Sequence, residues 1–174
     1  MNRSIRQRVI NLHRNIGKPW TGSYPLGFLP YIEKVYGVPN KPLHLFSGLV
    51  EGNFTVDLNR SLKPIVCANA EILPFKANSF DRIYADPPYN EQFAIHYSDK
   101  MSEKRTYGEY KPYCFMKEAF RVLEPDGLLF VLHWLVYSSK EGFEVDAVHA
   151  VNQGPNHRMR ALTVLHKPIP LDSF

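Results

Sequence analysis

The chain has 174 residues, of which 44% are hydrophobic and 22% charged. This suits one folded domain and excludes a largely disordered polymer. A formal net charge of +4 is mildly basic and does not by itself identify a partner. No apolar run approaches the ~20 residues that cross a bilayer, and no apolar segment follows the first basic residues as in a secretory signal. We therefore expect a cytoplasmic protein without membrane attachment, and the compact chain suggests a prokaryotic or phage-encoded one.

Residues 1–40 are predicted to be an N-terminal helical segment. Apolar residues recur at loosely helical spacing over residues 4–15, and residues 26–36 predict a second helix that ends at Gly37. Five basic residues and no acidic residue fall within the first eighteen positions: Arg3, Arg6, Arg8, Arg14 and Lys18. These basic residues form either an arm that neutralises phosphates or a solvated helical face.

Short apolar runs follow, each ending in a small or polar residue, and they predict buried strands. The runs are residues 43–46, 54–58, 65–68, 80–85 and 128–134. Residues 111–123 predict a helix, which the Pro125-Asp126-Gly127 turn ends. Residues 143–151 and 158–167 predict a C-terminal antiparallel β-hairpin. The expected fold is a Rossmann-like α/β sheet in a single domain over residues 1–174, with residues 41–135 as catalytic core and 143–167 as terminal hairpin.

The expected sheet is a trimmed one. Only eight residues separate Gly48 from Asp57, whereas a parallel crossover usually takes a dozen or more. The connection over residues 59–64 is also too short for a helix. The first crossover helices are therefore short or missing, and either the N-terminal helix or a second subunit could cover the bare face.

The most informative segment is Asp86-Pro87-Pro88-Tyr89, which directly follows the strand predicted over residues 80–85. Methyl transfer to an aromatic amine needs acceptors for both N–H groups, so that the nitrogen lone pair points at the methyl donor. The Asp86 carboxylate and a neighbouring proline carbonyl are suitable acceptors, and Tyr89 offers a flat face for a base. The alternative is a Pro-Pro turn that closes a strand, with Asp86 as a helix cap.

This tetrapeptide at the end of the fourth strand resembles the signature of the DPPY-type N6-adenine amino-methyltransferases, which are class I S-adenosylmethionine-dependent methyltransferases. The resemblance implies transfer of a methyl group to an exocyclic amino group, above all N6 of adenine in DNA. Aspartate at the first position favours adenine over cytosine and counts against a protein amide. Related tetrapeptides in RNA methyltransferases leave an RNA base as an alternative substrate.

Other segments are similar to the family's cofactor motifs and come in the order that the family requires. Residues 45–48 look like the first motif, Asp57 like the acidic residue that binds ribose hydroxyls, and residues 69–75 like the stretch that reads the adenine ring. Residues 20–25 resemble the segment that holds the methionine carboxylate. The implied S-adenosylmethionine-binding residues are Thr21, Ser23, Phe46, Ser47, Gly48, Asp57, Asn69, Ala70 and Asp86.

The residues expected to hold substrate are Tyr89, Asn90, His133 and Arg158. His133 and Trp134 end the fifth strand, where residues more often simply cap a strand, and Arg158 and Arg160 share one strand face within reach of phosphate. Residues 91–112 interleave tyrosines with lysines, which suits unstacked bases but also a plain surface loop. DNA is favoured over RNA as the partner, with a homodimer or a separate recognition subunit open. No metal is expected, because the two cysteines have no zinc spacing. A catalytically idle Rossmann-like nucleic-acid-binding subunit is the alternative from another functional class.

Overall fold

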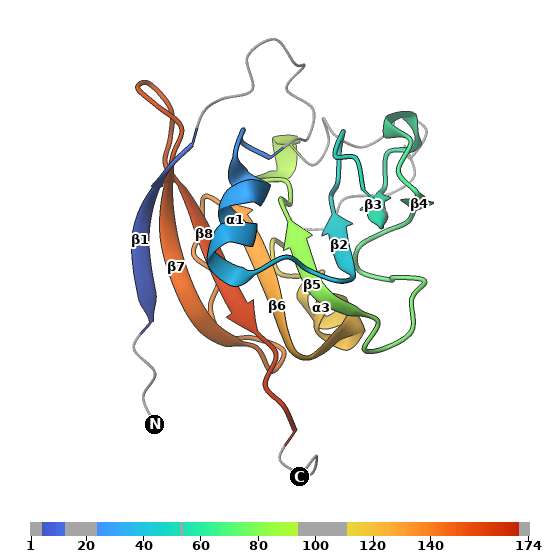
Figure 1. The fold of residues 1–174 in the computed structure, drawn as a ribbon. Helices are drawn as coiled ribbons and strands as arrows, with labels where there is room; N and C mark the ends of the chain where they lie inside the picture. The colour runs from blue at the N-terminus through green and yellow to red at the C-terminus, as the bar shows by residue number, and fades with distance from the viewer. Residues whose placement is uncertain (1–4, 13–23, 53, 94–110, 171–174) are drawn as a thin grey trace.

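The computed structural model describes residues 5–12, 24–52, 54–93 and 111–170 (Figure 1). Their main feature is an eight-stranded sheet in the order β1-β7-β8-β6-β5-β2-β3-β4. The strands are β1 (Arg6–Asn11), β2 (Pro42–Leu45), β3 (Thr55–Asp57), β4 (Val66–Cys67), β5 (Phe80–Ala85), β6 (Leu123–His133), β7 (Glu144–Asn152) and β8 (Arg160–His166). The helices whose bounds lie within these ranges are α1 (Phe28–Tyr36), the 3-10 turn η1 (Arg60–Leu62) and α3 (Met116–Val122). No helix in these ranges is long and apolar enough to cross a membrane.

Seven strands run in one direction, and only β8 is antiparallel to its neighbours β6 and β7. The chain passes outward from β2 through β3 to β4, then returns to β5 on the other side of β2. That return is a topological switch point, where open α/β sheets bind ligands beyond the carboxyl ends of the strands. The expected Rossmann-like sheet and its terminal antiparallel hairpin are both confirmed.

The trimmed crossovers are also confirmed. No helix occurs between β2 and β3 in the described residues, and the β3–β4 connection holds only η1. The strand predicted over residues 80–85 coincides with β5. The turn expected at residues 125–127 is instead a bulge within β6, where Asp126 has φ 65° and the pairing with β5 shifts register. The helix predicted over residues 111–123 is shortened to α3.

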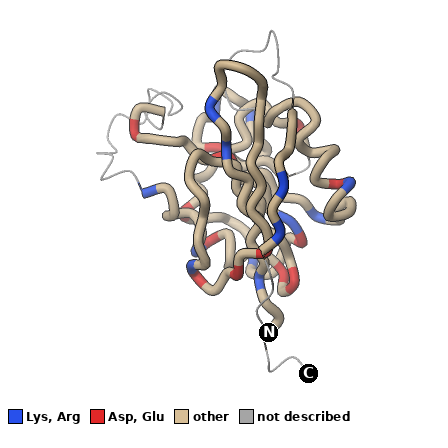
Figure 2. The backbone as a smooth tube through the Cα atoms, turned by 90° about the vertical axis from the view of Figure 1, so that its left-hand side faces the viewer, with Lys and Arg blue, Asp and Glu red and all other residues tan. Residues whose placement is uncertain are grey.

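The helix predicted over residues 4–15 is wrong. Residues 6–11 form the edge strand β1, which pairs in parallel with β7 from Arg6–Ala147 to Asn11–Asn152. The β-branched Val9 and Ile10 favour a strand, and β7 supplies the hydrogen-bond partners that a short isolated helix would have to find within itself. Of the five basic residues, Arg6 and Arg8 lie in β1, where Arg6 pairs with Asp146, whereas Arg3, Arg14 and Lys18 lie outside the described residues. Figure 2, which faces this edge, shows both signs of charge there rather than one continuous basic band.

A helix lies on each face of the sheet (Figure 1), and an apolar core packs between each helix and the sheet. Alternate residues of β5 and β6 point to opposite sides, as a pleated strand requires. Ile83 and Leu129 pack on the α3 side, whereas Tyr84 and Phe130 pack on the α1 side with Phe28. Helix α1 ends at Gly37, whose φ of 81° suits glycine and whose N–H bonds the Glu33 carbonyl. These two cores hold the carboxyl ends of β2, β5 and β6 together at one edge.

A buried histidine should make the stability of the fold pH-dependent. His44 is 5% exposed and stacks on Tyr84, and its Nδ1 lies 3.2 Å from the Tyr24 hydroxyl oxygen. Burial lowers the pKa of His44 to about 4, whereas the unfolded chain should titrate near 6.5. Below pH ~6.5 the unfolded state therefore binds more protons than the folded state. Because of His44, the free energy of unfolding should decrease by roughly 3 kcal/mol as the pH falls from ~6.5 to about 4.

Urea unfolding at several pH values checks this prediction. His44→Phe removes the titrating group and should flatten the loss of unfolding free energy between pH ~6.5 and ~4. His133 and His149 have pKa values lowered in the same direction, so the difference between the wild type and His44→Phe isolates His44. Equal slopes for the two proteins would contradict the prediction.

Candidate functional site

The described residues of the two main predicted motifs lie at the carboxyl edge of the sheet, on both sides of the switch point. Strands β2 and β5 pair in register with Leu45 opposite Ala85. The loops that begin at Phe46 and at Asp86 therefore leave the sheet side by side. Two segments far apart in the sequence, one resembling a cofactor motif and one an amino-methylation motif, meet at this edge.

Asp86 is held by two neighbours from different parts of the chain. Its Oδ1 accepts a 2.6 Å hydrogen bond from the Tyr89 hydroxyl, and its Oδ2 lies 3.6 Å from Arg160 Nη1 on β8. Its side chain is 15% exposed. Burial raises the pKa of Asp86, and the positive Arg160 and the Tyr89 hydrogen bond oppose that rise. Asp86 is thus a carboxylate held away from water beside one cation.

Tyr89 belongs to an aromatic cluster at the mouth of the site. Its ring centroid lies 4.9 Å from that of His133 and 4.8 Å from that of Trp134, and Phe93 lies 6.1 Å away. The Arg160 guanidinium sits over Tyr89, and the exposed Arg158 sits over Trp134, at 4.8 Å. Aromatic planes with arginines stacked on them suit a flat, electron-rich ligand such as a nucleobase.

His133 supports the Asp86 motif from behind. Its side chain is fully buried, its Nδ1 accepts a hydrogen bond from Leu135 N–H, and its Nε2 lies 3.4 Å from the Pro88 carbonyl. The first contact requires an unprotonated Nδ1, so Nε2 carries the proton and points it at Pro88. Burial lowers the pKa of His133, which favours this neutral form. These contacts give His133 a positioning role; its predicted contact with substrate stays a prediction.

Asn90 is likewise engaged locally. Its Oδ1 accepts the backbone N–H of Phe93 at 2.9 Å and caps the short turn that leaves the motif. This bond orients the loop that carries Tyr89 and Phe93. Contact of Asn90 with substrate stays a prediction.

The turn after β2 has the features of a ligand cradle. Phe46 and Gly48 both have positive φ, 53° and 54°, and a non-glycine residue in that region is uncommon and tends to occur at functional sites. Between them, Ser47 is 1% exposed, and its Oγ finds no hydrogen-bond partner among the described residues. A buried hydroxyl at the edge of the switch point is a group that a bound ligand could satisfy.

Asp57 joins this turn to the end of β3. Its Oδ2 accepts the Gly48 N–H and its Oδ1 accepts the Asn59 N–H, each at 2.9 Å. The carboxylate thus hydrogen-bonds the turn after β2 to the end of β3. Because each carboxylate oxygen has a second lone pair, both can still accept a hydroxyl.

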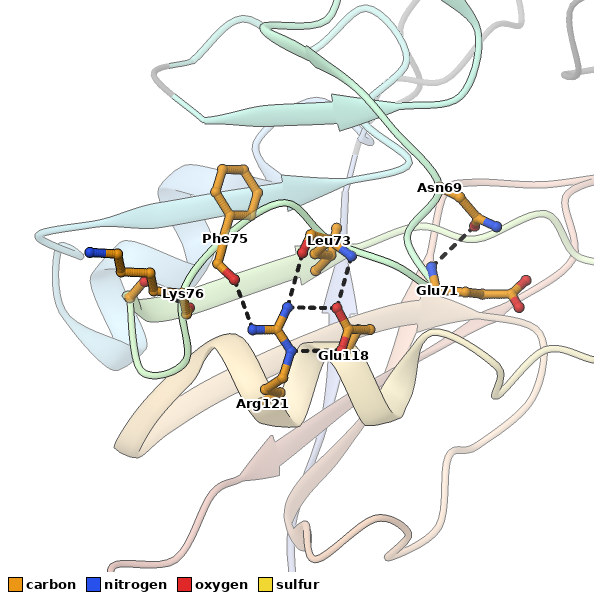
Figure 3. Close-up of polar contacts among 8 residues, drawn as sticks. Asn69, Glu71, Leu73, Phe75, Lys76, Glu118 and Arg121 are labelled. Carbon is orange, nitrogen blue, oxygen red and sulfur yellow. Dashed lines mark hydrogen bonds and ion pairs between the residues drawn. The ribbon is translucent and has the colours of Figure 1, made fainter.

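The segment predicted to read an adenine ring is tied to helix α3 (Figure 3). Glu118 accepts the Leu73 N–H at 2.8 Å, and Arg121 donates to the carbonyls of Leu73 and Phe75 at 3.0 and 2.7 Å. Glu118 and Arg121 also pair with each other, which lowers the pKa of Glu118. At the start of this segment Asn69 Oδ1 accepts the Glu71 N–H. The pairing of Glu118 with Arg121 could have been predicted from the sequence, because an acidic and a basic residue three positions apart lie on the same helix face.

Some predicted site residues lie outside the described part of the chain, and one residue predicted to contact phosphate lies instead beside Asp86. Thr21, Ser23 and residues 94–110 of the tyrosine-rich insertion lie outside the described residues. Ala70 is buried beside Asn69. Arg160, expected to reach phosphate, instead turns to Asp86 and Tyr89 with a side chain only 22% exposed. No pattern in the sequence signals that contact, because it depends on how β8 pairs.

No protein-family model matches the sequence, and no curated protein matches it. Among solved structures, the chain is similar to a methyltransferase of Thermotoga maritima described as a possible histamine N-methyltransferase, at 16% identity and TM-score 0.50 over 80% of this chain and 87% of that one. It is also similar to the 1,6-didemethyltoxoflavin-N1-methyltransferase of Burkholderia thailandensis, at 12% identity and TM-score 0.51 over 80% and 76%. TrmN from Thermus thermophilus is 21% identical with a TM-score of 0.47; the match covers 94% of this chain but 44% of TrmN. The chain has the Rossmann-like fold of S-adenosylmethionine-dependent methyltransferases.

Proposed function

We propose that this protein transfers a methyl group from S-adenosylmethionine to an exocyclic amino nitrogen, with N6 of adenine in DNA as the favoured acceptor. The observation that carries the proposal is the position of Asp86. Its shielded carboxylate lies at the carboxyl end of β5, beside the strained glycine turn after β2 and next to an aromatic cluster. The fold and the order of its motifs support the same reading.

The residues at the switch point fit the cofactor. The buried Ser47 hydroxyl and the positive φ of Gly48 make the turn after β2 suitable for the methionine part. Asp57, with lone pairs remaining, would hold ribose hydroxyls, and Asn69 and Ala70 would hold the adenine ring. When bound, S-adenosylmethionine supplies an electrophilic methyl group on a sulfonium. Arg121 and Glu118 would keep the adenine-reading segment in place.

The Asp86 side chain and a proline carbonyl of the motif would accept the two N–H groups of the target amine. Each acceptor polarises an N–H bond so that electron density gathers on the nitrogen. Together the two acceptors favour tetrahedral geometry, in which the lone pair is less delocalised into the ring and points at the methyl carbon. This role needs the ionised form of Asp86, because a protonated carboxyl loses an acceptor site. The site offers this catalysis by positioning and electrostatics, without a covalent nucleophile.

The aromatic cluster supports a nucleobase as the acceptor. Tyr89, Phe93 and Trp134 provide planar surfaces, and the exposed Arg158 stacks on Trp134. Base stacking on such residues contributes about 1–3 kcal/mol, which helps to hold a base turned out of its helix. The preference for DNA over RNA rests on the resemblance of the Asp86 motif.

The direct test is incubation of the purified protein with labelled S-adenosylmethionine and separate pools of unmethylated DNA, RNA and protein. We expect label in DNA, recovered as N6-methyladenine after digestion to nucleosides. Label in RNA would move the substrate but keep the amino-methylation chemistry. If no pool is labelled and calorimetry shows no cofactor binding, the protein is an idle Rossmann-like subunit and the proposal fails.

A further inference from the structure

Arg160 reaches the proposed site from the far end of the chain. Strand β8 runs antiparallel to β6, with Ala161 opposite His133, so its first residue lies at the same sheet edge as the carboxyl ends of β5 and β6. The hairpin that precedes it carries Arg158 to the rim. The side chain of Arg160 is 22% exposed and points inward to the Asp86 motif, whereas Arg158 is exposed on Trp134.

The guanidinium of Arg160 makes two contacts with the motif at once. Its Nη1 lies 3.6 Å from Asp86 Oδ2, and its Cζ lies 5.2 Å from the centre of the Tyr89 ring. Tyr89 in turn donates its hydroxyl to the other carboxylate oxygen. Arg160, Tyr89 and Asp86 therefore form a closed triangle, in which one cation fixes both the acid and the ring. Arginine suits this arrangement because its planar group can pair with a carboxylate and stack on an aromatic face.

We propose that Arg160 is a positioning residue of this site, which holds the Asp86 carboxylate in its ionised form and fixes the Tyr89 ring beside it. The meaning of this role for catalysis rests on the proposed function, but the interaction itself does not. Among the described residues, the groups that face Asp86 are Arg160 from β8, Tyr89 from the motif and Tyr24 from the segment before α1, whose hydroxyl bonds His44. Arg160 is the cation among them, so it opposes the effect of burial.

The test follows the Asp86 carboxyl directly, in the protein without cofactor, by carbon-detected NMR titration. The Asp86→Asn spectrum assigns the signal. Arg160→Met keeps the length of the side chain but removes its charge, and we expect the Asp86 titration midpoint to move to higher pH. Arg160→Lys keeps the charge and should restore most of the wild-type midpoint. Arg158→Met, in the loop two residues before Arg160, should leave the midpoint unchanged.

A second readout links the interaction to turnover. With Arg160→Met, the acid limb of the kcat profile should shift to higher pH in the same direction, and kcat at acidic pH should fall about tenfold or more, with a smaller change in KM. Thermal unfolding confirms that the variant folds; if it does not, Tyr89→Phe removes the hydrogen bond to Asp86 and should move the midpoint the same way. An Asp86 midpoint that is the same in folded Arg160→Met and wild type overturns the inference. A shifted midpoint in a protein that transfers no methyl group would instead uphold the inference and refute the proposed function.

Discussion

Asp86→Asn is expected to reduce methyl transfer by about 10²- to 10³-fold, the range seen when one preorganised polar group is removed from a catalytic site. The substitution keeps the size of the side chain but removes the charge that accepts the amine N–H. It also replaces one acceptor oxygen with an NH2 group, which would face the target amine as a second donor. Turnover with labelled S-adenosylmethionine and the preferred nucleic acid measures the loss.

The resemblance also implies a contact of Asp86 with the cofactor, but most of the cofactor affinity should survive this substitution. Asp86 lies on the β5 side of the switch point, while the cradle formed by Phe46, Ser47 and Gly48 follows β2. Calorimetry should therefore give S-adenosylmethionine affinities for Asp86→Asn and wild type within about a few-fold of each other. Asp81→Asn, at the opposite end of β5, is the matched control and should retain activity. Wild-type turnover by Asp86→Asn would remove Asp86 from the mechanism.

Asp57→Ala is expected to weaken S-adenosylmethionine binding at least about tenfold and to lower the free energy of unfolding by roughly 2 kcal/mol. The variant loses the acceptor of the Gly48 and Asn59 N–H groups. Each N–H left without a partner in a partly buried position costs its desolvation energy. The Gly48 turn would also lose the hydrogen bond that holds it at the sheet edge. The variant therefore loses the proposed ribose contact and also disturbs the turn that would bind the methionine part. Calorimetry and urea unfolding measure the two effects.

The chain offers a close control for this second experiment. Asp81 also accepts two backbone N–H groups, from Asn40 at 2.7 Å and Lys41 at 2.8 Å, but at the amino end of β5, away from the switch point. Asp81→Ala should therefore lose stability without losing cofactor affinity. Equal losses of affinity in the two variants would mean that Asp57 acts only through global stability.

Much of the fold was predictable because the relevant signals are local. The run over residues 80–85, which is apolar except for Asp81 and Arg82, predicts β5 to the residue, since a strand buried on both faces is rich in apolar residues. The eight residues between Gly48 and Asp57 limit the crossover physically, so the missing helix also follows from chain length. The position of Asp86 directly after a strand places it at the ligand edge of any such sheet.

Other features depend on partners that are distant in the sequence. Residues 6–11 have apolar spacing compatible with a helix, yet they form β1 because β7, some 140 positions later, supplies the paired backbone groups. Arg160 lies on Asp86 because β8 returns antiparallel to β6 in one particular register. A shift of that register by one residue would turn Arg160 to the opposite face of the sheet. The sequence by itself thus determined most of the strands and which motif meets the ligand edge. The strand pairing, a long-range property, decided that residues 6–11 form a strand and which charges surround the acid.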